Sequence, residues 1–420
     1  MRMTAPLRIT DSPSRGTGSL ALLLLLALLA PAGCTAPDPR FVVQGEIRGF
    51  PFQGTTSSEE SQALLQEMLV GSGRAPGAWL GTVRLDRTEL AGPPDRGTLQ
   101  RIAEEYSHDV ATIVFAHQVL GQEQNRRMQS LYLKNLAWIR TAPELAGRTI
   151  AQAAAGYTFV FAPAWLYRSH PWNGADFRRP RRLLEAHGIE TRLLDLAEDG
   201  VVEENAARIA AALREPGTPG RRRVVVSTSK SGAETALALG ELLEPEELSD
   251  VAAWVNIGGV IRGTPLADVG LTSWRGSIAR AWFSLQGWNW AAVESLATPI
   301  RRARFAGLRF PEALLVVNFI GAPLSGDMTL YSRPGHALLH GFGPNDGATL
   351  LADQIVPGSL TVLQPGVDHY FDLPDADLRS LALLKSVLDL VAAGSWRREM
   401  AMVPAFPGPR REPASPGAMP

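Results

Sequence analysis

Two patterns of hydrophobic and polar positions divide the chain near residue 156. Beyond it, short apolar runs bounded by turn residues alternate with stretches in which apolar residues recur every three or four positions. The runs are typical of parallel strands buried on both faces, and the periodic stretches are typical of amphipathic helices. We therefore predict an α/β fold with a mostly parallel sheet flanked by helices. The predicted strands are 157–162, 189–196, 222–228, 251–258, 313–320 and 359–364, and the clearest helices are 204–214 and 375–393.

Residues 41–150 follow a helical pattern and predict a mainly helical N-terminal region. A stripe runs through Ile102, Tyr106 and Val110 at spacings of four. We find no catalytic constellation in this region, and we interpret His108 and His117 as surface or packing residues. The other predicted elements are a short strand at 41–43, a brief helix at 61–69, a loop at 71–97 and a second helix that ends near Pro143 or Gly147.

A helical, aromatic-rich segment at 264–312 interrupts the alternation of strands and helices. It carries four of the ten tryptophans, which are Trp274, Trp282, Trp288 and Trp290. One interpretation is an insertion whose aromatic side chains pack among themselves. The other is a cap over an apolar substrate pocket, because large aromatic surface near a site often faces a ligand. Residues 397–420 are rich in proline and lack an apolar period, which predicts a disordered tail.

The first 33 residues have the pattern of a signal peptide, with arginines followed by an apolar run at 20–29. This run is too short for an easy membrane span. Ala30-Pro31-Ala32 fits a general signal-peptidase site, whereas Ala32-Gly33-Cys34 resembles the lipobox of bacterial lipoproteins. Cys34 is the only cysteine, so it cannot form an internal disulfide. We predict export to the bacterial cell envelope with lipidation of Cys34 as a membrane anchor, and a periplasmic or secreted soluble form is the alternative. The mass of the mature N-terminus distinguishes the two.

Composition narrows the function classes. The chain has 420 residues, with 45% hydrophobic and 20% charged positions, which is ordinary for a globular protein with a sizeable core. A formal net charge of −1 gives no global field that would favour nucleic acid. The arginine clusters at 178–182 and 221–223 lack interleaved aromatics and are interpreted as solvated faces. We predict no nucleic-acid partner and no cofactor, and the pattern leaves the oligomeric state open.

The candidate chemistry begins at residues 224–239, VVVSTSKSGAETALAL, which predict a strand, a tight turn and a helix that follow one another directly. Ser229 lies at the apex of the turn. A nucleophile on such a turn requires small neighbours two positions away, and Ser227 and Ser231 meet that requirement. The alternative is an ordinary strand–loop–helix junction in which the serines serve as turn and N-cap residues. Ser229 is therefore a candidate nucleophile at the carboxyl end of a parallel strand, where ligands bind in such sheets.

A serine nucleophile needs a base and an acid, which are expected in the order serine, acid, histidine. His369 in QPGVDHYF follows the last predicted strand and is the candidate base. Asp346 in GPNDGATL is the candidate acid, and Asp327 in LSGDM is its rival. Asp368 adjoins His369, but neighbours in a loop seldom face each other.

Two further groups of residues bear on the chemistry of this site. His336 and His340 are alternative bases, and their spacing of four suits a metal only if they are helical; no carboxylate accompanies them at a familiar metal spacing, so we predict no metal. An oxyanion needs two backbone N–H donors. Lys230 is one candidate, and the loop after 157–162 supplies Ala164 or Trp165, since Pro163 has no N–H.

Together these parts resemble the α/β-hydrolase fold family, and within it bacterial lipases and esterases, over residues 156–395. The turn at Ser229, the NDG at 345–347 and the GVDH at 366–369 occur in family order, and IRGTPLADV at 261–269 resembles the loop where the cap of secreted lipases begins. The chain departs from the family pattern at Pro163-Ala164, where His-Gly is usual, and at Ser227 and Ser231, where glycine is usual.

The resemblance implies an exported serine hydrolase that cleaves carboxylic esters, with lipid esters as a narrower expectation. In that interpretation Ser229 attacks, His369 transfers the proton and Asp346 orients His369. The alternatives are a binding lipoprotein that keeps the fold without catalysis, and an acyltransferase or thioesterase with the same triad.

Overall fold

The computed structural model describes residues 40–71, 83, 90 and 92–394. The predicted signal peptide, Cys34 and the predicted tail lie outside these residues. Within them, no helix combines the length and the apolar character that crossing a bilayer requires.

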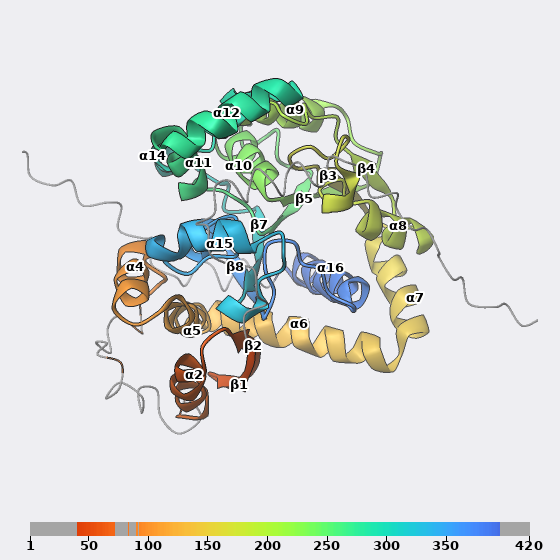
Figure 1. Cartoon of the computed structure of the whole chain (residues 1–420). Coiled ribbons are helices and arrows are strands. Elements are labelled where there is room, and N and C mark those ends of the chain that lie inside the picture. The colour runs from red at the N-terminus through yellow and green to blue at the C-terminus, as the bar shows by residue number, and fades with distance from the viewer. Residues whose placement is uncertain (1–39, 72–82, 84–89, 91, 395–420) are drawn as a thin grey trace, which may run out of the picture.

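A six-stranded parallel sheet with the order β4-β3-β5-β6-β7-β8 forms the centre of the molecule (Figure 1). The prediction of a mostly parallel sheet flanked by helices is confirmed. The strand predicted at 189–196 is shorter than expected, since only three of its residues pair with β3. The strands are β3 (Tyr157–Ala162), β4 (Thr191–Leu193), β5 (Arg222–Thr228), β6 (Val251–Ile257), β7 (Leu315–Ala322) and β8 (Leu360–Pro365).

Helices cover both faces of the sheet because strand side chains alternate between two apolar clusters. Val224 and Val226 face one cluster, and Val225 faces the other. The first face packs against α7 (Pro143–Ala154), α8 (Arg178–Ala186) and α16 (Ala376–Ala393), and the second against α9 (Val202–Arg214), α10 (Lys230–Leu237) and the π-helical turn η2 (Ala238–Leu242). The short 3₁₀ segments are η1 (Pro171–Asn173), η3 (Ser325–Asp327), η4 (His340–Phe342) and η5 (Leu351–Gln354).

The N-terminal region begins with an antiparallel hairpin that sequence reasoning only partly anticipated. The strand expected at 41–43 is longer and pairs with a second strand across a turn at Arg48 and Gly49, which both have positive φ. The single helical stripe expected from Ile102 to Val110 is broken, because Ser107 caps a new helix by accepting a hydrogen bond from Val110 N–H. The elements are β1 (Phe41–Ile47), β2 (Phe50–Thr56), α2 (Glu59–Gly71), α4 (Arg96–Glu105), α5 (His108–Val119) and α6 (Glu123–Thr141).

The helix α6 seals the free edge of β8. Thr361 N–H donates to Asn125 Oδ1 at 2.9 Å, and Leu363 N–H donates to Gln129 Oε1 at 2.9 Å. Gln129 Nε2 donates back to the Leu363 carbonyl at 3.2 Å. Two side chains one helical turn apart thus replace the hydrogen bonds of a further strand, and the N-terminal region closes an edge that would otherwise pair with other chains.

Replacing both Asn125 and Gln129 with leucine is expected to lower the free energy of unfolding by roughly 2–6 kcal/mol, because two buried N–H groups of β8 lose their acceptors. Urea unfolding measures this loss. The exposed Ser130 and Lys134 of the same helix provide the control, and their double leucine variant is expected to change stability by less than about 1 kcal/mol. Equal stability of the two double variants would contradict the edge-sealing role.

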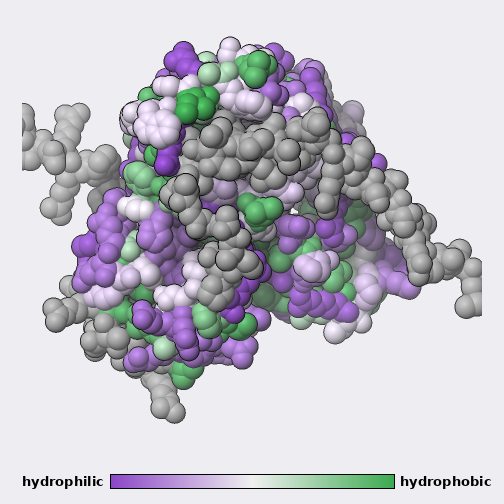
Figure 2. Space-filling view, in the orientation of Figure 1, coloured by the Kyte–Doolittle hydropathy of each residue, from purple (hydrophilic) through white to green (hydrophobic). Residues whose placement is uncertain are grey.

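The segment predicted as a helical cap contains four helices. They are α11 (Pro265–Thr272), α12 (Trp274–Gln286), α13 (Trp290–Glu294) and α14 (Thr298–Gly307), and α15 (Arg333–Leu339) follows β7. α12 carries exposed hydrophobic side chains, among them Ile278 and Leu285. Figure 2 shows hydrophobic surface among hydrophilic residues at the top of the molecule, where this helix lies.

Candidate active site

Ser229 occupies a strained turn between β5 and α10. Its φ of 49° and ψ of −127° lie in a region that residues with a side chain rarely adopt. The backbone is held there by Ser229 N–H to the Ile257 carbonyl at 3.2 Å and by Val260 N–H to the Ser229 carbonyl at 2.9 Å. Gly232 follows because a Cβ at this position would lie 2.7 Å from Gly259 Cα. The turn therefore holds the Ser229 side chain at the carboxyl end of the sheet.

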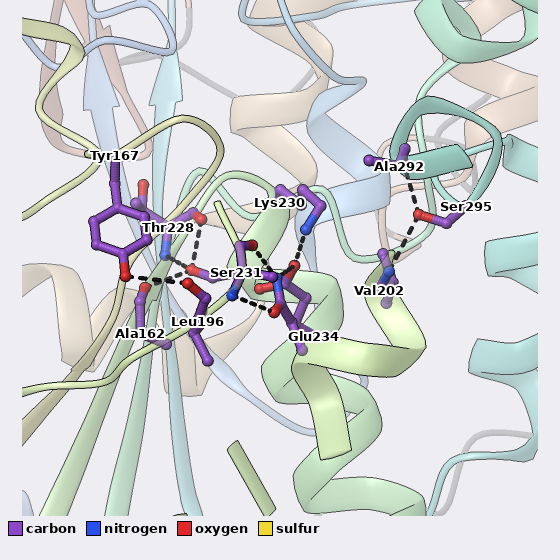
Figure 3. A network of polar contacts seen from close by, with 12 residues as sticks. Ala162, Tyr167, Leu196, Val202, Thr228, Lys230, Ser231, Glu234, Ala292 and Ser295 are labelled. Carbon is purple, nitrogen blue, oxygen red and sulfur yellow. Dashed lines mark hydrogen bonds and ion pairs between the residues drawn. The ribbon is translucent and has the colours of Figure 1, made fainter. Parts of the chain in front are cut away.

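The serines on either side of Ser229 make specific contacts. Ser231 Oγ donates to the Ala162 carbonyl at 2.7 Å and accepts from Thr228 N–H at 3.0 Å (Figure 3). Ser227 Oγ accepts from Trp254 Nε1 at 2.8 Å. Where a glycine would only leave space, Ser231 ties the turn to the end of β3, from which the candidate oxyanion loop departs.

The structure brings Ser229, His369 and Asp346 together. His369 Nε2 lies 2.9 Å from Ser229 Oγ, and His369 Nδ1 lies 2.8 Å from Asp346 Oδ2. A carboxylate only accepts hydrogen bonds, so Nδ1 carries the hydrogen and Nε2 is free to accept the serine hydroxyl. This is the order and the tautomer that a serine nucleophile requires.

Asp346 is fully buried, and its carboxylate accepts hydrogen bonds from four donors. Its Oδ1 accepts from Ala348 and Thr349 N–H, both at 2.9 Å, and its Oδ2 accepts from Gln354 Nε2 at 2.9 Å as well as from His369. Gln354 was not identified from the sequence, since nothing near it marks a functional residue. Burial lowers the pKa of His369, but the charge of Asp346 and its hydrogen bond, with the charge of Asp368, outweigh burial and raise it overall.

The two other candidate carboxylates have different partners. Asp327 accepts from Thr55 N–H at 2.8 Å and from Leu324 N–H at 2.9 Å, so it fastens the hairpin β1–β2 to the loop after β7 and does not contact His369. Burial raises the pKa of Asp327 to about 6. Asp368 accepts from Thr329 and Tyr370 N–H and does not orient the neighbouring histidine by hydrogen bonding. Neither carboxylate makes a hydrogen bond to His369, whereas Asp346 does.

Three other histidines, His108, His336 and His340, form a separate cluster. The rings of His108 and His336 lie 4.4 Å apart, and His336 Nδ1 lies 3.1 Å from Asn345 Oδ1. Burial lowers the pKa of both. Neither His336 nor His340 approaches Ser229 in any contact of the described residues, and no group of three or more His, Cys, Asp or Glu within 40–71 and 92–394 could hold a metal ion. These histidines pack the acid loop against the N-terminal region.

The candidate oxyanion donors differ in their availability. Ala164 N–H donates to the Ala175 carbonyl at 3.1 Å. This N–H is already engaged, which corrects the expectation that Ala164 could serve as an oxyanion donor. Lys230 is the first residue of α10, where a backbone N–H has no partner within the helix. In the described part of the chain, the backbone N–H of Trp165 makes no hydrogen bond. Lys230 and Trp165 therefore remain as the candidate donors.

A buried ion pair lies directly behind Ser229. The Lys230 ammonium contacts Glu234 one turn along α10, and Asn205 Nδ2 donates to the same carboxylate at 2.9 Å (Figure 3). The side chain of Asn205 also accepts from Ala197 N–H and donates to the Ala197 carbonyl. Tyr167 of the candidate oxyanion loop donates to the Leu196 carbonyl at 3.1 Å. The segment around Ala197 thus joins the first turn of α10 to the candidate oxyanion loop.

Replacing Lys230 with methionine is expected to lower the free energy of unfolding by about 3–5 kcal/mol, because Glu234 remains buried without its partner. Burial already raises the pKa of Glu234 despite the opposing charge of Lys230. The double variant K230M/E234M is expected to recover all but about 1.5 kcal/mol. Chemical denaturation measures both.

The control for this prediction is Arg208→Met, which removes an ion pair of the same spacing on the exposed surface of α9. Its expected cost is below about 1 kcal/mol. A Lys230→Met variant as stable as this control would contradict the importance of the buried pair.

Aromatic side chains of the cap pack around Phe283 and extend to the oxyanion loop. The Phe283 ring lies 5.3 Å from Trp288, 5.1 Å from Trp290 and 5.7 Å from Trp165. Trp274, by contrast, is 70% exposed on the outer side of α12. Internal packing therefore accounts for most of the aromatic content of the cap, and the cap rests on the loop that carries Trp165.

No family model matches the chain, and no curated protein matches its sequence. Among solved structures, it is similar to a metagenomic carboxyl esterase (21% identity, 58% of this chain and 76% of that chain, TM-score 0.45). It is also similar to the mature form of a lipase from Bacillus licheniformis (24% identity, 51% and 84%, TM-score 0.42) and to an esterase B from Lactobacillus rhamnosis (17% identity, 58% and 78%, TM-score 0.34).

Proposed function

We propose that this protein is a serine hydrolase that cleaves carboxylic esters. The observation that carries the proposal is the continuous chain of hydrogen bonds from Ser229 through His369 to Asp346, with distances of 2.9 and 2.8 Å. A strained turn presents the serine, and a fully buried, multiply anchored carboxylate orients the histidine. An ordinary turn serine needs neither feature.

In the proposed reaction, Ser229 Oγ attacks the acyl carbon while its proton moves to His369 Nε2. Asp346 stabilises the imidazolium that forms. The tetrahedral intermediate then expels the alcohol, which takes the proton from His369 and leaves an acyl group on Ser229. Water, deprotonated by the same histidine, releases the acid and restores the enzyme.

The negative oxygen of the tetrahedral intermediate is proposed to accept hydrogen bonds from the backbone N–H groups of Lys230 and Trp165. The Lys230 N–H lies at the N-terminus of α10, where the helix dipole favours negative charge. Trp165 belongs to the loop that Ser231 and Tyr167 fasten on either side. The same triad would also serve transfer to another alcohol, and water is proposed as the acceptor because it needs no second binding site.

An ester with an apolar acyl group fits the surroundings of the base best. Tyr370 lies beside His369 with ring centroids 6.2 Å apart, and Tyr331 lies 5.6 Å from Tyr370 and 5.2 Å from Trp172. This row of rings offers apolar surface next to the reacting atoms. A lipid ester is the corresponding narrower proposal.

Labelling with alkyl fluorophosphonates tests the proposed function. One covalent adduct is expected on Ser229, located by mass spectrometry of peptides, and a long alkyl chain is expected to react faster than an ethyl group. Ser229→Ala abolishes the adduct, while the exposed cap variant Ser284→Ala retains it. An intact folded protein that remains unlabelled, or a label that survives Ser229→Ala, would refute the proposal; equal rates for both probes would remove only the apolar preference.

A further inference from the structure

A cavity of about 630 Å³ lies between the N-terminal region and the cap, with three arginines in its wall. Arg96 belongs to the first turn of α4, Arg262 to the loop after β6 and Arg302 to α14. In Figure 1, α4 and α14 lie on the same side of the molecule, below and above α15. The fold therefore gathers three guanidinium groups from distant parts of the sequence around one hollow.

Two acidic residues, Asp95 and Asp353, share the wall of the cavity with the three arginines, and Asp268 lies outside this wall. Asp353 lies among them, with Arg302 Nη2 at 2.8 Å from Oδ1 and Arg96 Nη1 at 3.5 Å from Oδ2. Asp95, the other acidic residue of the wall, is occupied as the N-cap of α4, where it accepts from Thr98 N–H at 2.8 Å. The charge of Asp268 also favours the charged form of Arg96, and Asp268 Oδ1 accepts from Thr298 N–H at 2.8 Å.

The arginines retain donors for a ligand. A guanidinium carries five N–H donors in a fixed fork. Arg262 uses one on the Ala352 carbonyl at 3.0 Å and lies over the Phe305 ring at 4.6 Å, and Arg302 uses Nη2 on Asp353 Oδ1 at 2.8 Å. Burial lowers the pKa of Arg262, Asp353 opposes this effect, and the charge of Arg302 lowers it further. An anion in the cavity would relieve this mutual repulsion.

We propose that this cavity binds a phosphate group through Arg96, Arg262 and Arg302. Planar forks of N–H donors match the oxygens of phosphate, and converging guanidinium groups are a usual solution for recognising it. The N-terminus of α4 lies at the same wall and its dipole favours an anion there, with Thr98 N–H already capped by Asp95. The site is separate from Ser229 and does not depend on the proposed esterase activity.

Isothermal titration with inorganic phosphate, against chloride at equal ionic strength, tests the site. Arg302→Gln is expected to weaken binding by about tenfold, because it removes a charged hydrogen-bond donor. Asp353→Asn is expected to strengthen binding, because it removes the internal carboxylate that competes for the same arginines. If the cluster only fastens α4 to the cap, neither the unaltered protein nor the two variants will bind phosphate.

A second arginine-lined cavity of about 410 Å³ provides the matched control, and Arg178→Gln in its wall is expected to leave phosphate binding unchanged. Loss of binding in this variant, no binding by the unaltered protein, or weaker binding by Asp353→Asn would each overturn the proposal. Substitution of an arginine also removes its structural contacts, so the gain expected for Asp353→Asn is the decisive arm.

Co-sedimentation with vesicles distinguishes the two sources of the phosphate. For these assays Cys34→Ser removes any acyl anchor. Sedimentation with phosphatidic acid vesicles but not with phosphatidylcholine vesicles, lost in Arg302→Gln, assigns the site to a lipid headgroup. Binding of free phosphate in the titration, without sedimentation on either kind of vesicle, assigns the site to a soluble phosphate compound. Both results support the phosphate site.

Discussion

Substitution of Ser229 by alanine is expected to lower kcat for a short-chain aryl ester by roughly 10⁴- to 10⁶-fold, because the group that forms the acyl-enzyme is lost. Residual hydrolysis then comes only from binding and the oxyanion donors. The free energy of unfolding is expected to change by less than about 1 kcal/mol, since the backbone contacts with Ile257 and Val260 do not involve the hydroxyl.

Steady-state kinetics at saturating substrate and urea unfolding of the same preparations measure both quantities. The exposed Ser284→Ala variant of the cap is the control and is expected to retain full activity. Activity of Ser229→Ala within tenfold of the unaltered protein would assign the hydrolysis to another residue.

Replacement of Asp346 by asparagine is expected to lower kcat by roughly 10³- to 10⁴-fold through the tautomer of His369. Oδ1 of Asp346 accepts from two backbone N–H groups, so the amide oxygen of asparagine must take that side. The amide NH₂ then faces His369 Nδ1, which becomes an acceptor, and the hydrogen moves to Nε2. His369 can no longer take the proton of Ser229. Gln354 tolerates the change, because its Oε1 has no partner in the described structure and can turn toward the new donor.

The pH dependence follows from the same contact. Asp346 raises the pKa of His369, and catalysis needs the neutral imidazole, so the acid limb of kcat/KM lies at the raised pKa. Without the carboxylate charge this pKa falls, and the residual acid limb of Asp346→Asn is expected at lower pH. Asp327→Asn is the control, and its kcat is expected to stay within about threefold because Asp327 contacts Thr55 and not His369. An unshifted acid limb in Asp346→Asn would contradict the assigned acid.

The strands and the serine turn were predictable because their signals are local. An apolar run that ends in small residues and continues as a helix specifies the turn at Ser229 within 16 positions. The choice between Asp346 and Asp327 was not local. Both follow β7, and what separates them is Thr55 on the N-terminal hairpin, 272 positions from Asp327. No pattern near Asp327 announces that partner.

The supporting contacts of the site were harder to anticipate, because each residue involved is an unremarkable polar residue in its own segment. Gln354 contacts Asp346 eight positions away, and Asn205 contacts Glu234 29 positions away. Two missed features did have local signals. Ser107, which caps α5 through Val110 N–H, marks the helix boundary, and Arg48-Gly49 between two apolar stretches marks the hairpin turn. Ala164 failed as an oxyanion donor because its partner, the carbonyl of Ala175, comes from the far end of a loop.

The sealing of β8 by α6 has a consequence for the order of events during synthesis. Asn125 and Thr361 are 236 positions apart, so the ribosome delivers the sealing helix long before the strand that it seals. Until residues 360–365 emerge, Asn125 Oδ1 and Gln129 Oε1 lack the N–H groups of β8, and β7 is the unprotected edge of the growing sheet. Contacts of such long sequence separation form slowly. The nascent chain therefore passes through an extended interval in which the edge of β7 needs protection by chaperones. This interval ends only when β8 emerges and pairs with β7.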